Sequence, residues 1–331
     1  MSRPILAQIK AVFYPVLVAF GVPANLLTVA IVFRGRCGLS KCISRYLLSM
    51  ALADLMVLVV NVTLQFIKPM YFPGSLLDIT PVCSIIFYLG VVAIDCSVWF
   101  TVLFTFDRFI AICFQNIKAK YCTEKTATVI ITSVCVISLA LNVGFCFIFE
   151  PAKVIDNIPM FCVVKSTFYT SPLWAAYYWL RVALTPLVPF VLIALLNALT
   201  IRHITRASRV RRELRGSGKG ESHSDPEIEN RRKSIVLLLA ISGSFILLWA
   251  VNVVHKICIS ITDAVLFQKY VTNVFSILAI IGVMLQSLSS CTNTVIYAVA
   301  QTKFRAEMVT LIKSPYDLMH TLTKLCLKKC I

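Results

Sequence analysis

Charged side chains are scarce in this sequence of 331 residues. Asp, Glu, Lys and Arg make up 14% of it, whereas hydrophobic residues make up 59%. Soluble domains contain about a quarter charged and about half apolar residues, so water is not the main solvent of this chain. The composition excludes an ordinary soluble domain and indicates a membrane protein.

Residues typical of catalytic sites are also few. The four histidines are scattered at positions 203, 223, 255 and 320. No H-E-x-x-H pair occurs, which would place two zinc-binding histidines on one helical face. We find no nucleophile constellation either, so we expect no enzymatic activity and no organic cofactor. The two halves of the chain lack the similarity typical of secondary transporters, which leaves a transporter as the weaker alternative.

Long uncharged runs are abundant instead. A bilayer core about 30 Å thick is crossed by about 20 apolar residues in a helix, and helix is the default there because lipid cannot hydrogen-bond the backbone. The predicted spans are residues 11–33, 46–67, 83–113, 126–149, 172–201, 233–258 and 271–299. The predicted fold class is an all-α membrane protein, a seven-transmembrane helix bundle forming a single domain over residues 1–331.

The cations define a topology. The net charge is +17, and 23 of the 32 Lys and Arg residues lie in alternate connections and in the C-terminal tail. Only 6 lie in the N-terminal end and the other connections. The positive-inside rule places the C-terminus in the cytoplasm and the N-terminus outside. Because the cations form no single patch, we expect no nucleic-acid partner; the basic segments suit anionic lipid or a cytoplasmic protein.

The C-terminal part of the sequence predicts a helix that lies on the membrane surface, followed by a tail. Residues 301–313 place Phe304, Met308, Leu311 and Ile312 on one helical face, which predicts a short amphipathic eighth helix on the cytoplasmic surface. The tail, residues 314–331, carries Cys326 and Cys330 beside lysines. Cytoplasmic cysteines near basic residues are candidates for palmitoylation, and inert thiols are the alternative.

A few ionisable residues lie inside the predicted spans. Asp54 is in the middle of the second, Asp95 and Arg181 are in the outer halves of the third and fifth, and Asp107 with Arg108 is near the inner end of the third. Charge within a bilayer is costly, so each of them is a functional hypothesis.

Motifs now appear in order along the chain: Asn25, Asp54, Cys83 with Cys162, Asp107-Arg108-Phe109, Pro189, Phe245 with Trp249, and Asn293 with Tyr297. Across nearly its full length the sequence resembles the rhodopsin-like G-protein coupled receptors. Residues 21–29 and Asn197 further resemble the orphan branch around G-protein coupled receptor 139. The resemblance implies a plasma-membrane receptor, a disulfide between Cys83 and Cys162, and an extracellular ligand.

The resemblance also implies an activation core. Asp54, Ser97, Trp249 and Asn293 would line a small cavity that holds a sodium ion, a hard cation suited to carboxylate, hydroxyl and amide oxygens. Asn25, Phe245 and Tyr297 belong to the same core. The alternative is a protonated Asp54 that hydrogen-bonds to Asn25 and Asn293.

At the cytoplasmic end, the resemblance implies that Arg108 is held by Asp107 at rest and is released toward a heterotrimeric G protein, with Asn197 taking part. A plain surface ion pair is the alternative. Many relatives hold this arginine with a second acidic residue at the base of span six, where this chain has Arg231. We therefore predict a weak inactive-state latch and measurable basal signalling. The narrower resemblance suggests the Gq class.

Two departures stand out in spans six and seven. Val251 replaces the usual proline two residues after Trp249, so one cause of a helix kink is lost. Thr294 replaces proline after Asn293; threonine can bend a helix by bonding to the carbonyl four residues earlier. A receptor-like scaffold that does not signal is therefore the main alternative function.

The ligand pocket is expected between the outer halves of spans three, five, six and seven. Gly90 occupies the place of the aspartate of amine receptors, and no lysine for retinal lies between Lys269 and Lys303. Arg181 would bind a ligand carboxylate, or pair with Asp95. Asn252, His255 and Lys256 would complete a polar rim suited to a peptide or an amino-acid-like molecule.

Overall fold

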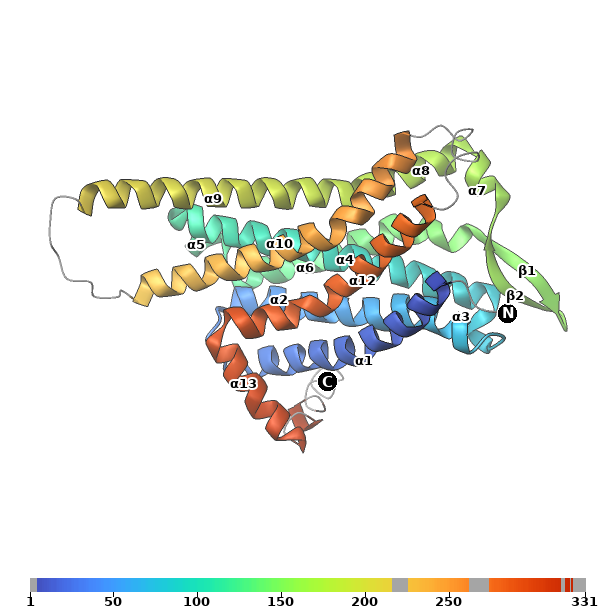
Figure 1. Ribbon diagram of the computed structural model, residues 1–331, viewed down its shortest axis with the longest axis horizontal. Helices are drawn as coiled ribbons and strands as arrows, with labels where there is room; N and C mark the ends of the chain where they lie inside the picture. Colours follow the sequence, from blue (N-terminus) through green and yellow to red (C-terminus); the bar gives the residue numbers. More distant parts are fainter. Residues whose placement is uncertain (1–4, 216–225, 262–273, 317–318, 322, 324–331) are drawn as a thin grey trace.

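The computed structural model describes residues 5–215, 226–261, 274–316, 319–321 and 323. Within these residues, seven helical stretches are long and apolar enough to cross a bilayer. They run along the long axis of the molecule, with a β-hairpin at one end and the extensions of α9 (Val188–Arg215) and α10 (Pro226–Ile261) at the other (Figure 1). The predicted seven-helix bundle is confirmed.

The elements follow the chain in a simple order. Span one is α1 (Ile5–Arg34), and span two joins α2 (Lys41–Met56), the π-helical segment η1 (Val57–Ile67) and α3 (Lys68–Tyr71). Span three is α4 (Thr80–Cys113), and span four joins α6 (Glu124–Asn142) and η3 (Val143–Phe147). Span five joins α8 (Pro172–Val182), η4 (Ala183–Leu187) and α9; span six is α10 and span seven is α12 (Val274–Ala300). Shorter elements are η2 (Leu76–Asp78), α5 (Gln115–Tyr121), α7 (Ser166–Thr170) and α13 (Thr302–Lys313).

Several helices begin before the apolar run that predicted them. α2 begins at Lys41 rather than at residue 46, because the Ser40 side chain caps it by accepting a hydrogen bond from the Ile43 N–H. Thr123 caps α6 in the same way through the Thr126 N–H, 3.1 Å away. Hydropathy marks the part of a helix that suits lipid, whereas the cap decides where the helix starts.

The outside of the bundle is apolar. Leu247, Val299 and Val191 leave 75%, 73% and 63% of their surface exposed. Helical backbone satisfies its own hydrogen bonds, and apolar side chains on the outside then suit hydrocarbon rather than water. The chain is a multi-pass membrane protein.

The hairpin joins spans four and five. Strands β1 (Phe149–Ile155) and β2 (Ile158–Val164) pair antiparallel, with Ile155 opposite Ile158. Asp156 and Asn157 between them have φ of 51° and 61°, the left-handed region that a tight hairpin turn requires and that these residue types tolerate. Cys162 of β2 forms a disulfide with Cys83 of α4, at a Cα–Cα distance of 6.3 Å, which confirms the predicted pairing. This cross-link holds the hairpin on the bundle.

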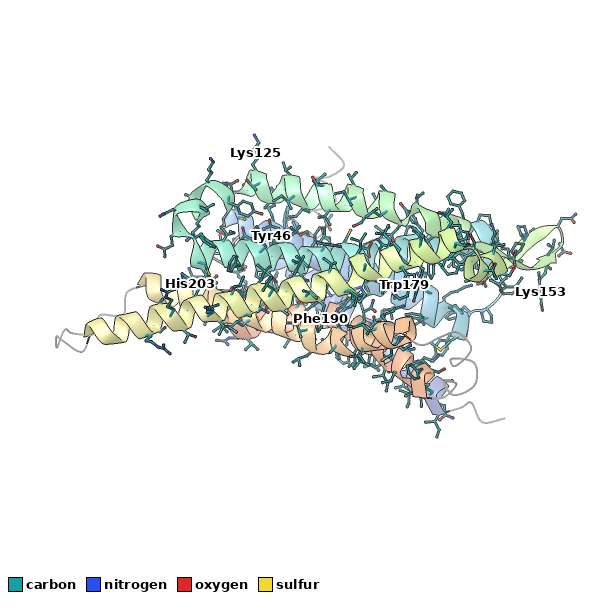
Figure 2. The ribbon with its side chains drawn as sticks, turned by 90° about the horizontal axis from the view of Figure 1, so that it is seen from above. Tyr46, Lys125, Lys153, Trp179, Phe190 and His203 are labelled. Carbon is teal, nitrogen blue, oxygen red and sulfur yellow. A yellow bond between two sulfur atoms is a disulfide. The ribbon has the colours of Figure 1, made fainter. Side chains whose placement is uncertain are left out.

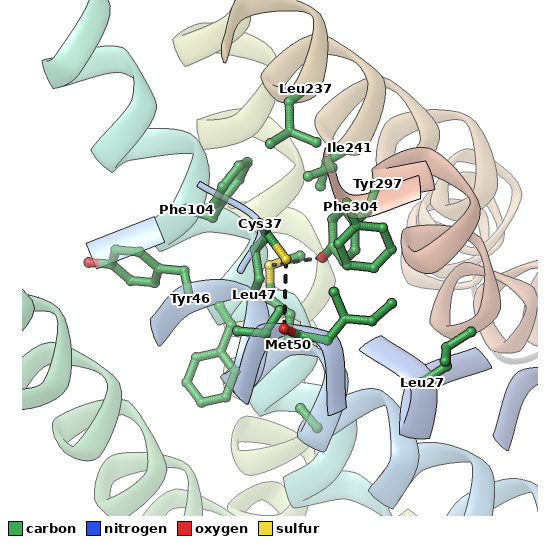
Figure 3. Packing of buried hydrophobic residues seen from close by; sticks show 14 of the residues in the cluster. Leu27, Cys37, Tyr46, Leu47, Met50, Phe104, Leu237, Ile241, Tyr297 and Phe304 are labelled. Atoms are coloured by element: carbon green, nitrogen blue, oxygen red, sulfur yellow. Dashed lines mark hydrogen bonds between the residues drawn. The ribbon is translucent and has the colours of Figure 1, made fainter. Parts of the chain in front are cut away.

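The largest buried cluster lies toward the other end. Tyr46, Met50 and Phe104 pack there with Tyr297, whose hydroxyl lies 4.0 Å from the sulfur of Met50 (Figure 3). The ring of Phe304 from α13 meets the ring of Tyr297 edge-on. Phe304 and Leu311 are fully buried, and Met308 packs on the same cluster, as the apolar face of residues 301–313 predicted. Ile312 is 60% exposed, because it lies beyond the edge of the stripe that docks.

Candidate functional site

Asp54 joins three spans at the centre of the bundle. Its side chain is fully buried. Ser97 Oγ of α4 donates a hydrogen bond to Asp54 Oδ1 at 2.6 Å, and Asn293 Nδ2 of α12 donates to Oδ2 at 2.8 Å. Spans two, three and seven are therefore linked through one carboxyl group.

Asn25 does not take part in that link. Its Nδ2 donates to the carbonyl of Gly21 at 3.0 Å and to the carbonyl of Ser290 at 2.8 Å. The alternative in which Asp54 hydrogen-bonds to both Asn25 and Asn293 is therefore half wrong: the bond to Asn293 is present, and Asn25 bonds to backbone carbonyls instead. Asn25 ties span one to the backbone of span seven through the Ser290 carbonyl.

A small cavity lies beside this carboxyl group. Its volume is about 10 Å³, room for about one water molecule. The lining residues, which are mostly polar, are Ser97, Thr101, Ile241, Ser244, Phe245, Ser289, Thr292 and Asn293. Hydroxyl and amide oxygens next to one carboxylate fit a small hard cation.

Trp249 stands behind the lining rather than in it. Its Nε1 donates to Ser289 Oγ at 3.2 Å, and its ring stacks on Phe245 at a centroid distance of 5.1 Å. The expectation that Trp249 lines the cavity is corrected. Ser289 lines the cavity, and Trp249 contacts it through the hydrogen bond from the indole N–H to the Ser289 hydroxyl. Ser289 and Thr292 are lining residues that the sequence pattern did not indicate.

Asp107 and Arg108 form a buried pair near the C-terminal end of α4. Arg108 Nε donates to Asp107 Oδ2 at 3.0 Å, and Nη2 binds the same oxygen. Asp107 is 1% exposed and Arg108 is 5% exposed, so the interpretation as a plain surface ion pair is wrong. The surrounding helices withdraw the pair from water.

Two thiols complete the surroundings of Asp107. Cys42 Sγ of α2 donates to Asp107 Oδ1 at 3.2 Å, and Cys122 Sγ donates to the Asp107 carbonyl at 3.7 Å. Nothing local in the sequence distinguishes these two cysteines as partners of Asp107. Burial, followed by the nearby Asp107 carboxylate, raises the pKa of Cys122 to about 12, so its thiol stays protonated.

Asn197 connects spans five and six. Its Oδ1 accepts a hydrogen bond from Ser242 Oγ at 2.9 Å, and both residues are buried. The backbone of Arg231 belongs to α10, but its side chain lies outside the described part of the structure, as do Cys326 and Cys330. The roles expected of these residues stay predictions.

The Thr294 hydroxyl bonds to span one rather than to the carbonyl four residues earlier in its own helix. Its Oγ1 donates to the Ala24 carbonyl of span one at 3.1 Å, and the hydroxyls of Thr28 and Thr294 lie 2.8 Å apart. The two helices approach closely enough for the hydroxyl to find a partner across the interface. Thr294 thus ties span seven to span one. Val251 lies within α10, which runs as one helix.

Asp95 of α4 and Arg181 of α8 are partners. Arg181 Nη2 binds Asp95 Oδ2, and Asn142 Nδ2 of α6 donates to the same oxygen at 2.7 Å. All three side chains are buried. Of the two alternatives for Arg181, the ion pair with Asp95 is the one that the structure contains. Asn142 is a third member that the sequence did not reveal.

The space beside Gly90 is filled by span two. A β-carbon on Gly90 would come within 2.1 Å of Gln65 Nε2, whose amide also donates to the Ile86 carbonyl at 3.1 Å. Asn61 Nδ2 in turn donates to Gln65 Oε1 at 3.2 Å. Gly90 therefore makes room for Gln65, and any side chain here would displace it.

The residues predicted to form the polar rim face different neighbours. Asn252 Nδ2 donates to Gln286 Oε1 of α12. Lys256 Nζ lies 3.3 Å from the Tyr178 hydroxyl and 5.5 Å from the centre of its ring, on α8. His255 is 8% exposed. Asn252 and Lys256 therefore tie span six to spans seven and five near the C-terminal end of α10.

Comparison with known proteins agrees with this geometry. Residues 24–297 match the family model described as "7 transmembrane receptor (rhodopsin family)". A curated relative, the "FMRFamide receptor" of Drosophila melanogaster, is 27% identical over 216 residues, which cover 61% of this chain. The match spans 38% of the length of that relative. Neither finding bears on the narrower likeness to the receptor 139 branch, which stays a prediction. The chain belongs to the rhodopsin family of seven-transmembrane receptors.

Proposed function

We propose that this chain is a plasma-membrane receptor that converts binding of an extracellular peptide into activation of a heterotrimeric G protein. The observation that carries the proposal is the buried Asp107–Arg108 pair at the end of α4. A buried arginine is stable only while its partner stays in place, so movement of the neighbouring helices would free a cation for a protein partner.

The charge pattern supports the orientation within this proposal. Most cations belong to the connections and the tail at the α13 end of the bundle. Figure 1 shows this end opposite the hairpin. The N-terminus is then extracellular and the C-terminus cytoplasmic. The Cys83–Cys162 disulfide lies at the opposite end, which suits an oxidising exterior.

The ligand class is drawn from the relative. A receptor named for the peptide FMRFamide is similar to 61% of this chain, which favours a peptide over an amino-acid-like molecule. Asn252, His255 and Lys256, near the outer end of α10, are the proposed contacts. Coupling to the Gq class remains part of the proposal and rests on the resemblance of the sequence alone.

A sodium ion is the proposed allosteric partner of the resting state. Asp54, Ser97 and Asn293 would hold it with oxygen ligands at the small cavity. When bound, such an ion supplies positive charge that stabilises the ionised form of a buried carboxyl group. These three side chains would then keep spans two, three and seven together.

Recruitment of G proteins in cells tests the proposal. Cells that express the chain are exposed to a panel of short peptides, amidated peptides included, while recruitment of each Gα class is recorded. Arg108→Ala should abolish recruitment and leave peptide binding and surface expression in place. Arg36→Ala, a change at an exposed arginine of the same face, is the matched control. Peptide binding without recruitment of any Gα class would contradict coupling.

A non-signalling receptor-like scaffold is the second candidate. The observation that favours it is the absence of proline at Val251 and Thr294, together with the bonds that tie Thr294 to span one. If these bonds lock the bundle, Val251→Pro should restore recruitment that the wild type lacks. Recruitment by the wild-type chain removes this candidate.

A further inference from the structure

A hollow opens between α5 and α9, where α4 gives way to α5. Its volume is about 450 Å³, within the range of small-molecule sites. Among its lining residues are Ile112, Phe114, Gln115, Asn116, Ile117 and His203. Figure 2 shows His203 on α9, the helix that forms one wall. The hollow is separate from the cavity beside Asp54 and from the outer polar rim.

The floor and one side of the hollow are apolar. Ile112 is buried beneath it, whereas Phe114 and Ile117 leave 45% and 48% of their surface exposed. The predicted spans three and five end at residues 113 and 201, so the hollow lies at the level where hydrocarbon gives way to headgroups. Large exposed apolar side chains at that level can contact acyl chains.

The rim of the hollow is positively charged. Lys118 lies one helical turn after Gln115, and Arg206 lies one turn after His203, so each shares a face with a lining residue. Both cations are exposed, and within the described residues neither forms an ion pair. Residues 109–123 and 188–209 contain no Asp or Glu. The surroundings therefore attract anions without an acidic competitor in these segments.

We propose that this hollow binds an anionic phospholipid of the cytoplasmic leaflet, with its phosphate groups on Lys118, Arg206 and His203 and an acyl chain over Phe114 and Ile117. The inference rests on the cytoplasmic orientation proposed above. A phospholipid matches the two halves of the site, because it carries a charged head and an apolar tail on one molecule. Cations beside a membrane surface recruit anionic lipid in this way.

Lipid binding to the purified full-length chain tests the inference without a G protein or a ligand. The probe is a phosphatidylinositol bisphosphate in phosphatidylcholine nanodiscs, and bound lipid is counted by native mass spectrometry. Each basic residue near an anionic surface contributes about fivefold in affinity, so Lys118→Gln with Arg206→Gln should weaken binding about 25-fold. Asn116→Trp, which fills the hollow without changing its charge, should also weaken binding.

Arg36→Gln with Lys125→Gln is the matched control. It removes the same charge from exposed residues of the same face, and Lys125 lies on α6, away from His203 (Figure 2). The control should retain the lipid. If the control loses as much lipid as the Lys118→Gln, Arg206→Gln variant, general electrostatic attraction explains binding and the inference is overturned. If the Asn116→Trp variant keeps its lipid, the hollow is not the site, which also overturns the inference. If the hollow variants keep the lipid but lose G-protein affinity in phosphatidylcholine alone, the surface docks protein and the lipid proposal is wrong.

Discussion

Asp95 on α4 and Arg181 on α8 form an ion pair with only 2% and 6% of their surfaces exposed. Asn142 of α6 adds a hydrogen bond to the same carboxylate oxygen, so one side chain connects spans three, four and five. Arg181 lies one turn before Thr185 of η4, a residue that leaves helical geometry at φ −152° and ψ 107°. The pair therefore holds span five next to the place where its helix is interrupted.

Removal of one member of this pair should be costly. Asp95→Asn or Arg181→Gln leaves a buried charge without its partner, and we expect a loss of about 3–5 kcal/mol for each single variant. The double variant should lose less than the sum of the two, because no charge is left uncompensated. Thermal unfolding of the purified variants measures this. Additive losses would show that the two charges do not interact, and Lys153→Gln, at an exposed lysine of the hairpin, should change little.

Sodium should weaken agonist binding through Asp54. In the wild type, sodium that stabilises the resting arrangement of Asp54, Ser97 and Asn293 should lower agonist affinity about fivefold or more. Asp54→Asn should remove this dependence, because an amide cannot compensate the charge of the ion. Binding of labelled agonist in sodium and in a large organic cation measures the difference. If Asp54→Asn keeps the full sodium effect, the ion binds elsewhere.

Basal signalling should fall when an acidic residue is placed at the base of span six. Arg231→Glu supplies a second carboxylate for Arg108, and we expect ligand-free G-protein activation to drop toward that of mock-transfected cells. Arg232→Glu makes the same charge change one position along the helix and should have less effect. Wild-type activity equal to that of mock-transfected cells would contradict the weak latch.

Acid should weaken the connection between α3 and α4, which contains Asp78. Burial alone would raise the pKa of Asp78, but the ion pair with Lys68 and hydrogen bonds from the Gly74 and Ser75 N–H groups outweigh it and hold this pKa below its ordinary value. The stabilisation is therefore complete above the unfolded pKa of about 4 and is lost as the pH falls through the lower folded value. Asp78→Asn should cost about 1.5–3 kcal/mol at neutral pH and much less in acid. Melting temperatures of the wild type and of the Asp78→Asn variant across this pH range test the prediction. A difference between the two that does not change with pH would contradict it.

Cys122 should react slowly with thiol reagents. Its raised pKa of about 12 leaves little thiolate at pH 8, even though each thiolate is more nucleophilic. We expect labelling by a maleimide on the order of fiftyfold slower than at a cysteine introduced by Lys125→Cys, an exposed position close by. Site-resolved mass spectrometry gives both rates in one chain. Equal rates would show that the thiol does not remain protonated beside Asp107.

Much of this protein could be predicted from local sequence. The thickness of the hydrocarbon core sets the length of an apolar run, so the spans could be located without a structure. Asp54 and the Asp107–Arg108 pair were recognisable because charge is rare within a bilayer. The cysteine pair was predictable from resemblance, since Cys83 and Cys162 occupy positions typical of the family.

The tertiary structure decided which of these residues meet. Nothing near Asn142, Cys42 or Gln65 in the sequence indicates that they contact Asp95, Asp107 and the space beside Gly90. Such contacts depend on how each helix is rotated about its axis and how far it slides along its neighbours, which packing across spans determines. Apolar periodicity indicates only that a helix suits lipid. The bond of Thr294 to span one could be identified only from the packed helices.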